Sequence, residues 1–302
     1  MSIPKITDYA LTDAAVFPKN KVDWPIDARK AVLLIHDMQN YFVDFYPQDS
    51  QLITQLVNNI QTLKNACKAA GIPVVYTAQP GDQNPEDRAL LTDFWGKGLK
   101  DDPALTHIID ALAPEQDDLQ YTKWRYSAFK RTPLLDYMQT EKKDQLIICG
   151  IYSHIGILST ALDGFMYDIK PIVIADAVAD FSEDEQKMAL SFIATRCGYI
   201  ETLDGALNTL NTTQPLATDV KFSIDTLQQD VANILQIPVS DIETDENLMY
   251  TGLDSIRVMT LLEKWRGDGA NITFLDLAEK TTIQEWWEVI HASMALPTTE
   301  EV

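Results

Sequence analysis

The stretch DQLIICGIYSHIGILSTALDGF (residues 144–165) decides the fold class of this chain. Its first part, QLIICG, is a short apolar run, which is typical of a strand buried on both faces of a parallel sheet. Its second part, SHIGILSTALDGF, predicts a helix whose small residues pack closely on that sheet. A strand followed directly by a helix is the repeating unit of α/β folds. The residue at the start of the helix, Gly156, has no side chain with which to react.

Similar apolar runs recur along the first two thirds of the chain, and amphipathic segments separate them. This alternation predicts an α/β domain of three layers, with a parallel sheet between helices. Functional sites in such domains lie at the carboxyl ends of the strands. The predicted strands are 31–35, 73–78, 118–123, 145–150 and 170–176, and the clearest predicted helices are 51–71 and 182–198.

The character of the sequence changes after residue 207. Residues 208–220 are polar and contain a proline, which is typical of a linker. Beyond them the apolar residues recur at helical spacing, which predicts a small four-helix bundle. Residues 213–302 also hold 16 of the 45 acidic residues but only 5 of the 24 basic ones. We therefore predict a first domain over 1–207, a linker over 208–220 and a second domain over 221–302.

Composition excludes several classes of protein. The net charge of −21 argues against partners such as nucleic acid or an anionic membrane surface. No apolar run is long enough to span a bilayer, and the N-terminal residues lack the features of a signal peptide. Three widely spaced cysteines form no disulfide framework, so we expect a cytoplasmic protein. The four histidines show no ligand spacing, so no metal site is predicted.

Polar residues follow four of the predicted strands. Asp37 follows the first, Gln79 the second, and Lys123 and Arg125 the third. The fourth strand is followed by the helix that begins at Gly156. A carboxylate, an ammonium group and a helix N-terminus at one sheet edge predict an active site.

Residues 1–207 resemble the isochorismatase family, a branch of the cysteine-hydrolase superfamily. The resemblance is carried by LLIHDMQNYF, VVYTAQP, DRALLTDFWGKGL, KWRYSAF and GIYSHIGILSTALDGFMYDIKP. The superfamily uses a triad of Asp, Lys and Cys, and the resemblance places Asp37 and Lys123 at the first two positions. The Cys position falls on Gly156, and isochorismatases are the branch that lacks this cysteine.

The resemblance implies hydrolysis of the vinyl ether of isochorismate, which gives 2,3-dihydro-2,3-dihydroxybenzoate and pyruvate. This reaction needs an acid rather than a covalent nucleophile, and the acid is Asp37. A cation beside Asp37 favours its charged form, whereas burial and an anionic substrate oppose that effect. The resemblance also implies a homodimer and a cis peptide after Ile151. The implied substrate-binding residues are Gln79 and Arg88, with Phe42, Trp95 and Tyr152 lining the pocket.

The stretch DENLMYTGLDSIRVMTL (245–261) resembles the attachment motif of acyl and aryl carrier proteins. The resemblance implies that Ser255 receives 4′-phosphopantetheine from coenzyme A. A phosphate there would lie at a helix N-terminus, where free N–H groups and the helix dipole favour it. The alternative is that Ser255 only caps the helix. A further alternative concerns Met249, Ile256, Met259 and Phe274, which belong either to the core or to a surface that contacts partners.

An isochorismatase fused to a carrier resembles the proteins of catecholate siderophore biosynthesis by non-ribosomal peptide synthesis. The implied partners are a phosphopantetheinyl transferase, a 2,3-dihydroxybenzoate-AMP ligase and the condensation domain of a synthetase. One alternative is a catalytically inactive hydrolase scaffold tethered to a working carrier. Another is an amidase such as a nicotinamidase, against which Gly156 argues, because amide hydrolysis in this superfamily uses the missing cysteine.

Overall fold

A computed structural model describes residues 3–11, 19–212, 222–268 and 270–294. The chain divides into two compact units, Met1–Gln214 and Pro215–Val302. Each unit is described here by itself. No helix in the described ranges is both long enough and apolar enough to cross a bilayer.

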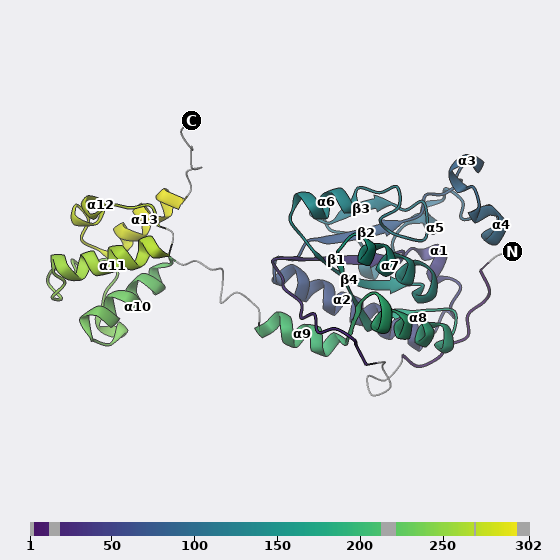
Figure 1. The fold of residues 1–302 in the computed structure, drawn as a ribbon, viewed down its shortest axis with the longest axis horizontal. Coiled ribbons are helices and arrows are strands. Elements are labelled where there is room, and N and C mark those ends of the chain that lie inside the picture. The colour runs from purple at the N-terminus through teal and green to yellow at the C-terminus, as the bar shows by residue number, and fades with distance from the viewer. Residues whose placement is uncertain (1–2, 12–18, 213–221, 269, 295–302) are drawn as a thin grey trace. The chain divides into compact units, whose positions relative to one another are not determined.

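The first unit is built on a six-stranded, fully parallel sheet in the order β3-β2-β1-β4-β5-β6 (Figure 1). The chain therefore runs outward from β1 to one edge and then returns to continue from β4 to the other. A crevice at the carboxyl ends of β1 and β4 is expected where the strand order reverses. The strands are β1 (Ala31–His36), β2 (Val74–Ala78), β3 (Leu119–Thr122), β4 (Gln145–Ile151), β5 (Lys170–Ala179) and β6 (Tyr199–Glu201).

Helices cover both faces of this sheet, which makes the three layers that the sequence predicts. Side chains alternate along β1, so that Leu33 and Ile35 pack with α2 and α9 on one face. Val32 and Leu34 pack on the other face with α6, α7 and α8. The helices are α1 (Asn40–Val43), α2 (Gln51–Ala69), α3 (Pro85–Arg88), α4 (Leu91–Trp95), α5 (Pro103–Thr106), α6 (Leu134–Thr140), α7 (Leu158–Met166), α8 (Glu183–Arg196) and α9 (Leu203–Thr212), with a 3₁₀ turn at Asp110–Leu112 and a π-helix at Ser153–Ile157.

The five predicted strands and both predicted helices are confirmed, with shifts of a few residues at their ends. The capping signal at Ser182 is also confirmed, because its hydroxyl accepts a hydrogen bond from the Glu185 N–H. The sequence prediction missed β6, which is only three residues long and shows no clear alternation.

The prediction that residues 208–212 belong to a linker is wrong, because α9 continues to Thr212. The helix continues because Leu203, Ala206 and Leu210 are buried in the core cluster that contains α2. These residues recur at a spacing of three and four, so one face of α9 is apolar to its last turn. The rest of the predicted linker, 213–220, lies outside the described residues.

The second unit is a small helical bundle, as predicted. Its centre holds Trp265 and Trp286, whose rings meet edge to face with centroids 5.7 Å apart. The Trp265 indole N–H donates a hydrogen bond to Asp230, at 2.9 Å. The helices are α10 (Ile224–Leu235), α11 (Ser255–Gly267), α12 (Phe274–Ala278) and α13 (Ile283–Met294), with a 3₁₀ turn at Val239–Asp241.

Candidate active site and attachment serine

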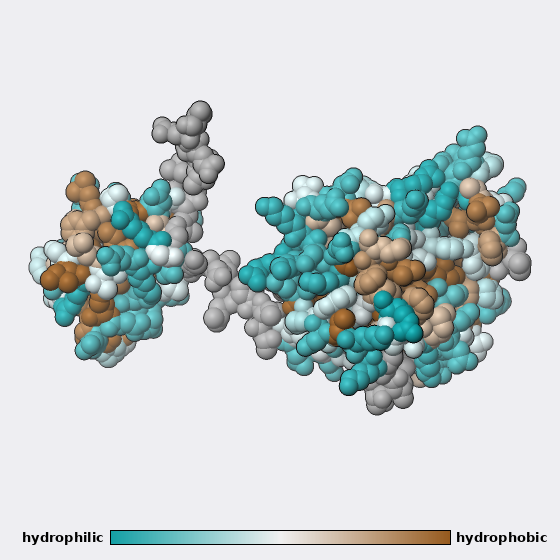
Figure 2. All heavy atoms as spheres, in the orientation of Figure 1, coloured by the Kyte–Doolittle hydropathy of each residue, from teal (hydrophilic) through white to brown (hydrophobic). Residues whose placement is uncertain are grey.

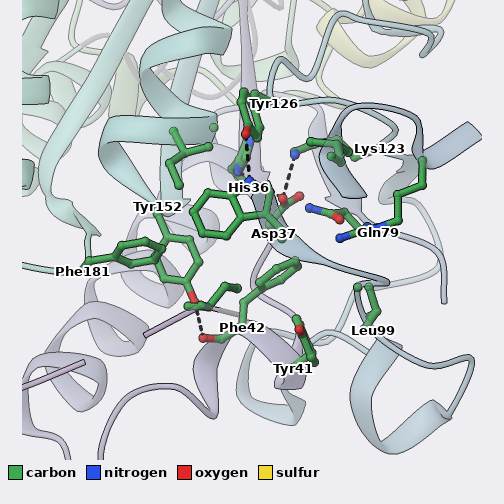
Figure 3. Close-up of a pocket in the computed structure, with 17 residues that line it drawn as sticks. His36, Asp37, Tyr41, Phe42, Gln79, Leu99, Lys123, Tyr126, Tyr152 and Phe181 are labelled. Atoms are coloured by element: carbon green, nitrogen blue, oxygen red, sulfur yellow. Dashed lines mark hydrogen bonds and ion pairs between the residues drawn. The ribbon is translucent and has the colours of Figure 1, made fainter. Parts of the chain in front are cut away.

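One pocket of the first unit collects the residues that follow four parallel strands (Figure 3). Asp37 follows β1, Gln79 lies just beyond β2, and Lys123 directly follows β3. Tyr152 follows β4, and Gly156 lies in the π-helix that comes next. The carboxyl ends of parallel strands meet at one edge of a sheet, so the fold itself brings these residues together.

Asp37 lies at the centre of this pocket and is almost fully buried. Its Oδ2 is 2.9 Å from Lys123 Nζ, and its Oδ1 accepts a hydrogen bond of 2.8 Å from the Thr77 hydroxyl. Its backbone has a φ of 51°, a conformation that few side chains adopt outside strained sites. The two donors hold both carboxyl oxygens of Asp37 in place.

Lys123 is held by two acceptors. Besides the contact with Asp37, its Nζ donates a hydrogen bond of 2.8 Å to the Arg125 carbonyl. The Arg125 side chain, which the sequence placed at the site, points elsewhere. Its guanidinium donates to the carbonyls of Asp87 and Trp124, and it does not line the pocket.

Arg88 also lines the pocket, and its guanidinium is buried with no carboxylate paired to it in the described part of the chain. Its Nε donates to the Gly96 carbonyl at 2.5 Å, whereas its Nη1 has no hydrogen-bond partner among the described residues. Burial lowers the pKa of Arg88. Gly98 gives the guanidinium its space, because a Cβ at that position would lie 2.4 Å from Nη1. An unpaired buried cation is costly, so the free Nη1 has an unmet need for an acceptor.

Gln79 is positioned by a second glutamine that does not line the pocket. The fully buried Gln39 accepts a hydrogen bond from the Gln79 N–H at 2.7 Å and donates to the Gln79 carbonyl at 2.9 Å. It also donates to the Thr106 carbonyl, at 2.8 Å. These bonds fix the backbone of Gln79, whose amide points into the pocket beside Asp37 (Figure 3).

Aromatic residues form the remaining walls. Phe42, Trp95 and Tyr152 all line the pocket. The Tyr152 hydroxyl donates a hydrogen bond of 2.6 Å to the Phe42 carbonyl. Its ring lines the pocket, and its hydroxyl is already bonded within the protein. The Trp95 indole N–H donates to the Tyr126 hydroxyl, at 2.8 Å. Sequence reasoning did not assign several other lining residues, which lie mostly on loops without a periodic signal: Ile3, Tyr41, Leu91, Gly98, Leu99, Tyr126, Ile155 and Phe181.

Gly156 contributes only backbone to the pocket. It is buried inside the π-helix, and its N–H donates to the Tyr152 carbonyl at 3.1 Å. The peptide between Ile151 and Tyr152 is cis, as the resemblance implies. The structure therefore offers no side chain from position 156 to attack a carbonyl.

A cluster of possible metal ligands, which sequence reasoning missed, lies next to the π-helix. It consists of His154, Asp180 and Glu185, and it is the one such group that the described residues show. Asp180 is already engaged, because its carboxylate accepts hydrogen bonds from the backbone N–H groups of His154 and Phe181 and bonds the His154 ring at 2.5 Å. These contacts anchor the π-helix, which explains the cluster without a metal.

The second functional site lies at the start of α11. Ser255 is its first residue and is exposed. The residue that caps the helix is Asp254, whose carboxylate accepts from the Arg257 N–H at 2.9 Å. No hydrogen bond of the Ser255 hydroxyl occurs within the part of the chain that the structure describes. The alternative that Ser255 only caps the helix is therefore wrong, and its hydroxyl is free to be modified.

Comparisons with known proteins assign a family to each of the two units. Residues 31–205 match the isochorismatase domain family, and residues 225–290 match the family described as a phosphopantetheine attachment site. The chain is 50% identical to the isochorismatase of Bacillus subtilis (strain 168), over 99% of each chain. It is 43% identical to enterobactin synthase component B of Escherichia coli (strain K12), over 96% of this chain and 98% of that protein.

The fold has matches among solved structures as well. The structure of a cysteine hydrolase from Pseudomonas syringae pv. phaseolicola 1448A superposes with a TM-score of 0.58 at 26% identity, covering 63% of this chain and 97% of that one. The family match, the identities and the fold lead to one conclusion: this chain belongs to the isochorismatase family and carries a C-terminal phosphopantetheine-binding domain.

Proposed function

We propose that this chain hydrolyses isochorismate to 2,3-dihydro-2,3-dihydroxybenzoate and pyruvate, and that its second unit carries 2,3-dihydroxybenzoate as a phosphopantetheine thioester. The observation that carries the first part is the composition of the pocket. It holds a buried acid, Asp37, and two buried cations, Lys123 and Arg88, beside a glycine where the superfamily has its nucleophile. Such a pocket suits an anionic substrate whose reaction begins with proton transfer.

The proposed reaction starts at the terminal CH₂ carbon of the enolpyruvyl group. Asp37 gives a proton to this carbon, and the electrons of the C=C bond form the new C–H bond. Water attacks the resulting oxocarbenium ion at the former vinyl carbon and loses a proton to the Asp37 carboxylate, which gives a neutral hemiketal. The bond between this carbon and the ether oxygen then breaks, and the hemiketal hydroxyl proton passes to that oxygen. The products are pyruvate and the ring hydroxyl.

Asp37 must be protonated before it acts. Its contact with Lys123, at 2.9 Å between Asp37 Oδ2 and Lys123 Nζ, holds the carboxyl in one orientation. Lys123 is therefore a residue that orients the acid.

Arg88 and Gln79 supply the polar contacts for binding. The unpartnered Nη1 of Arg88 is suited to a substrate carboxylate, because a charge-assisted bond would satisfy it. Phe42, Trp95 and Tyr152 enclose the ring of the substrate.

The carrier proposal rests on the free hydroxyl of Ser255. The phosphodiester formed there would lie at the N-terminus of α11, a helix of 13 residues, where backbone N–H groups favour an anion. When attached, 4′-phosphopantetheine supplies the thiol that holds the aryl group. A separate phosphopantetheinyl transferase catalyses the attachment.

The surface around Ser255 is proposed to contact the partner enzymes. Met249, Ile256, Met259 and Phe274 are all exposed, which excludes the alternative that they form the core. Figure 2 shows hydrophobic side chains on the visible surface of this unit among hydrophilic ones. Asp245, Glu246 and Asp254 are exposed as well and make this surface acidic. A surface that is acidic and apolar suits an AMP ligase and a condensation domain that present basic and apolar groups.

We propose that the protein is a homodimer, which light scattering of the full chain tests. We also propose a cytoplasmic location, which is supported by three free cysteines: Cys67, Cys149 and Cys197, all buried.

The test of the catalytic proposal is pyruvate release from isochorismate by wild type and by Asp37→Asn. Wild type should release pyruvate, and Asp37→Asn should be at least about 100-fold slower, because general acid catalysis contributes roughly that much. Asp49→Asn, an exposed aspartate with no role in the pocket, is the matched control. Equal rates for wild type and Asp37→Asn would remove Asp37 from its role, and no release by either would favour the inactive scaffold.

A further inference from the structure

The space beside Gly156 is filled by the imidazole of His36. A Cβ built on Gly156 would lie 2.1 Å from His36 Cε1 and 2.7 Å from Nε2. Side-chain atoms do not approach this closely, so any side chain at position 156 requires the imidazole to move. Ser153 and Ile157, the first and last residues of the π-helix, are buried as well.

Moving the imidazole would break a buried hydrogen bond. His36 is 1% exposed, and its Nδ1 is 2.7 Å from the Ile151 carbonyl oxygen. Since a carbonyl only accepts, Nδ1 is the nitrogen that carries the proton in this contact. Burial lowers the pKa of His36, which favours the neutral ring with this single proton. Displacing the ring would leave a buried carbonyl without its donor.

Displacement of His36 would also change the position of Asp37. His36 is the last residue of β1, where it pairs with Thr77 on one side and Gly150 on the other. Asp37 follows directly in its constrained conformation, and its backbone N–H donates to the Thr77 carbonyl. A shift of His36 is therefore transmitted to Asp37.

From these contacts we infer that His36 is a specificity-determining residue, which excludes a nucleophile from position 156 by occupying the space of its side chain. The pocket is restricted to reactions without a covalent intermediate by the pair His36 and Gly156, not by Gly156 alone. This inference rests on the proposed function in one respect only, namely that the excluded chemistry is attack by a covalent nucleophile on the substrate. The steric coupling itself is independent of the substrate.

The test compares Gly156→Cys in two backgrounds, wild type and His36→Asn, by thermal unfolding of the full chain. An asparagine can keep a donor near the Ile151 carbonyl, while it removes the ring atoms Cε1 and Nε2. In wild type, Gly156→Cys should lower Tm by roughly 5 °C or prevent folding. In His36→Asn it should change Tm by no more than about 2 °C, because the overlapping atoms are gone.

The control is Gly164→Ala, in which the added Cβ would meet Phe129 at 3.2 Å and not His36. Its effect on Tm should be the same in both backgrounds. Gly156→Ala, alone and with His36→Ala, repeats the test with a smaller side chain. An equal loss of Tm from Gly156→Cys in both backgrounds, or failure of the double variant to fold where His36→Asn folds, would overturn the inference.

Pyruvate release gives a second readout. Gly156→Ala should lower kcat at least 10-fold because His36 displaces Asp37, and His36→Asn should restore part of that loss. If wild type releases no pyruvate, the proposed function fails, while the coupling of the two positions in Tm still decides the inference about His36.

Discussion

Arg88 and Asp37 are both almost completely buried, but they differ in whether their polar atoms have hydrogen-bond partners. Asp37 has a cation and a hydroxyl as donors, whereas the Arg88 Nη1 has no partner. Holding an unpaired cation out of water lowers the stability of the fold. We therefore propose different roles for the two residues: Asp37 transfers a proton to the substrate, and Arg88 binds an anionic group of the substrate.

Arg88→Met should separate binding from stability. The variant loses a charge-assisted hydrogen bond to the substrate, worth about 1.5–3 kcal/mol, so kcat/KM should fall roughly 10- to 150-fold, mainly through KM. Its Tm should stay the same or rise, because the buried cation is removed. Steady-state kinetics and thermal unfolding measure both, with the exposed Arg131→Met as control. An unchanged KM would contradict a role in binding.

Thr77→Val should weaken the acid without unpacking the sheet. The two side chains have nearly the same shape, but valine cannot donate to Asp37 Oδ1. We expect kcat to fall about 10-fold, which corresponds to the loss of one hydrogen bond to a charged group. Thr77→Ser keeps the donor and should retain most of the activity. Equal kcat values for the serine and valine variants would show that this hydrogen bond does not matter.

At the scale of elements, the strands and their ends could be predicted, while the segments between them could not. Buried strands leave a periodic apolar signal, and the residue after each strand is placed by the parallel topology, so Asp37 and Lys123 follow from sequence. Tyr126 and Phe181 lie on loops, where neighbours distant in sequence set the conformation. The π-helix at Ser153–Ile157 depends on Asp180, which lies 27 residues after Ser153 and gives no local sign.

The His154 contact makes the π-helix sensitive to pH. Burial of the ring lowers the pKa of His154, but its hydrogen bond and charge interaction with Asp180 outweigh this, and the net pKa is raised above 6.5. A raised pKa in the folded state means that protonated His154 stabilises the fold below pH 6.5. This contribution is lost as the pH rises through the folded-state pKa.

The measurement is the difference in Tm between wild type and His154→Gln as a function of pH. The difference should be largest below pH 6.5 and should shrink at higher pH. A constant difference across this range would show that the His154 charge does not anchor the π-helix.

The whole molecule consists of two units with separate cores and separate chemistry. Within the described ranges, each buried cluster draws its residues from one unit. The reactive groups of the first unit lie at strand ends, whereas Ser255 needs only exposure and a helix N-terminus. We therefore expect damage to one unit to leave the chemistry of the other intact.

Trp286→Ala tests this independence. Trp286 is fully buried, so its removal should destabilise the second unit by about 3–5 kcal/mol and prevent loading of Ser255 by a phosphopantetheinyl transferase. Pyruvate release should stay at the wild-type rate. Ser255→Ala is the companion variant, which should block loading but leave the fold of that unit unchanged. A large loss of pyruvate release from Trp286→Ala would show that the two units depend on each other.

In the proposed reaction, water adds to the enolpyruvyl carbon after protonation, without a covalent intermediate and without attack on the ring. Hydrolysis of isochorismate in ¹⁸O-labelled water distinguishes these routes, by mass spectrometry of the 2,3-dihydro-2,3-dihydroxybenzoate formed. We expect no label in this product, because the ether oxygen stays on the ring. Label in a ring hydroxyl would mean that water attacks the ring carbon, and it would contradict the role proposed for Asp37.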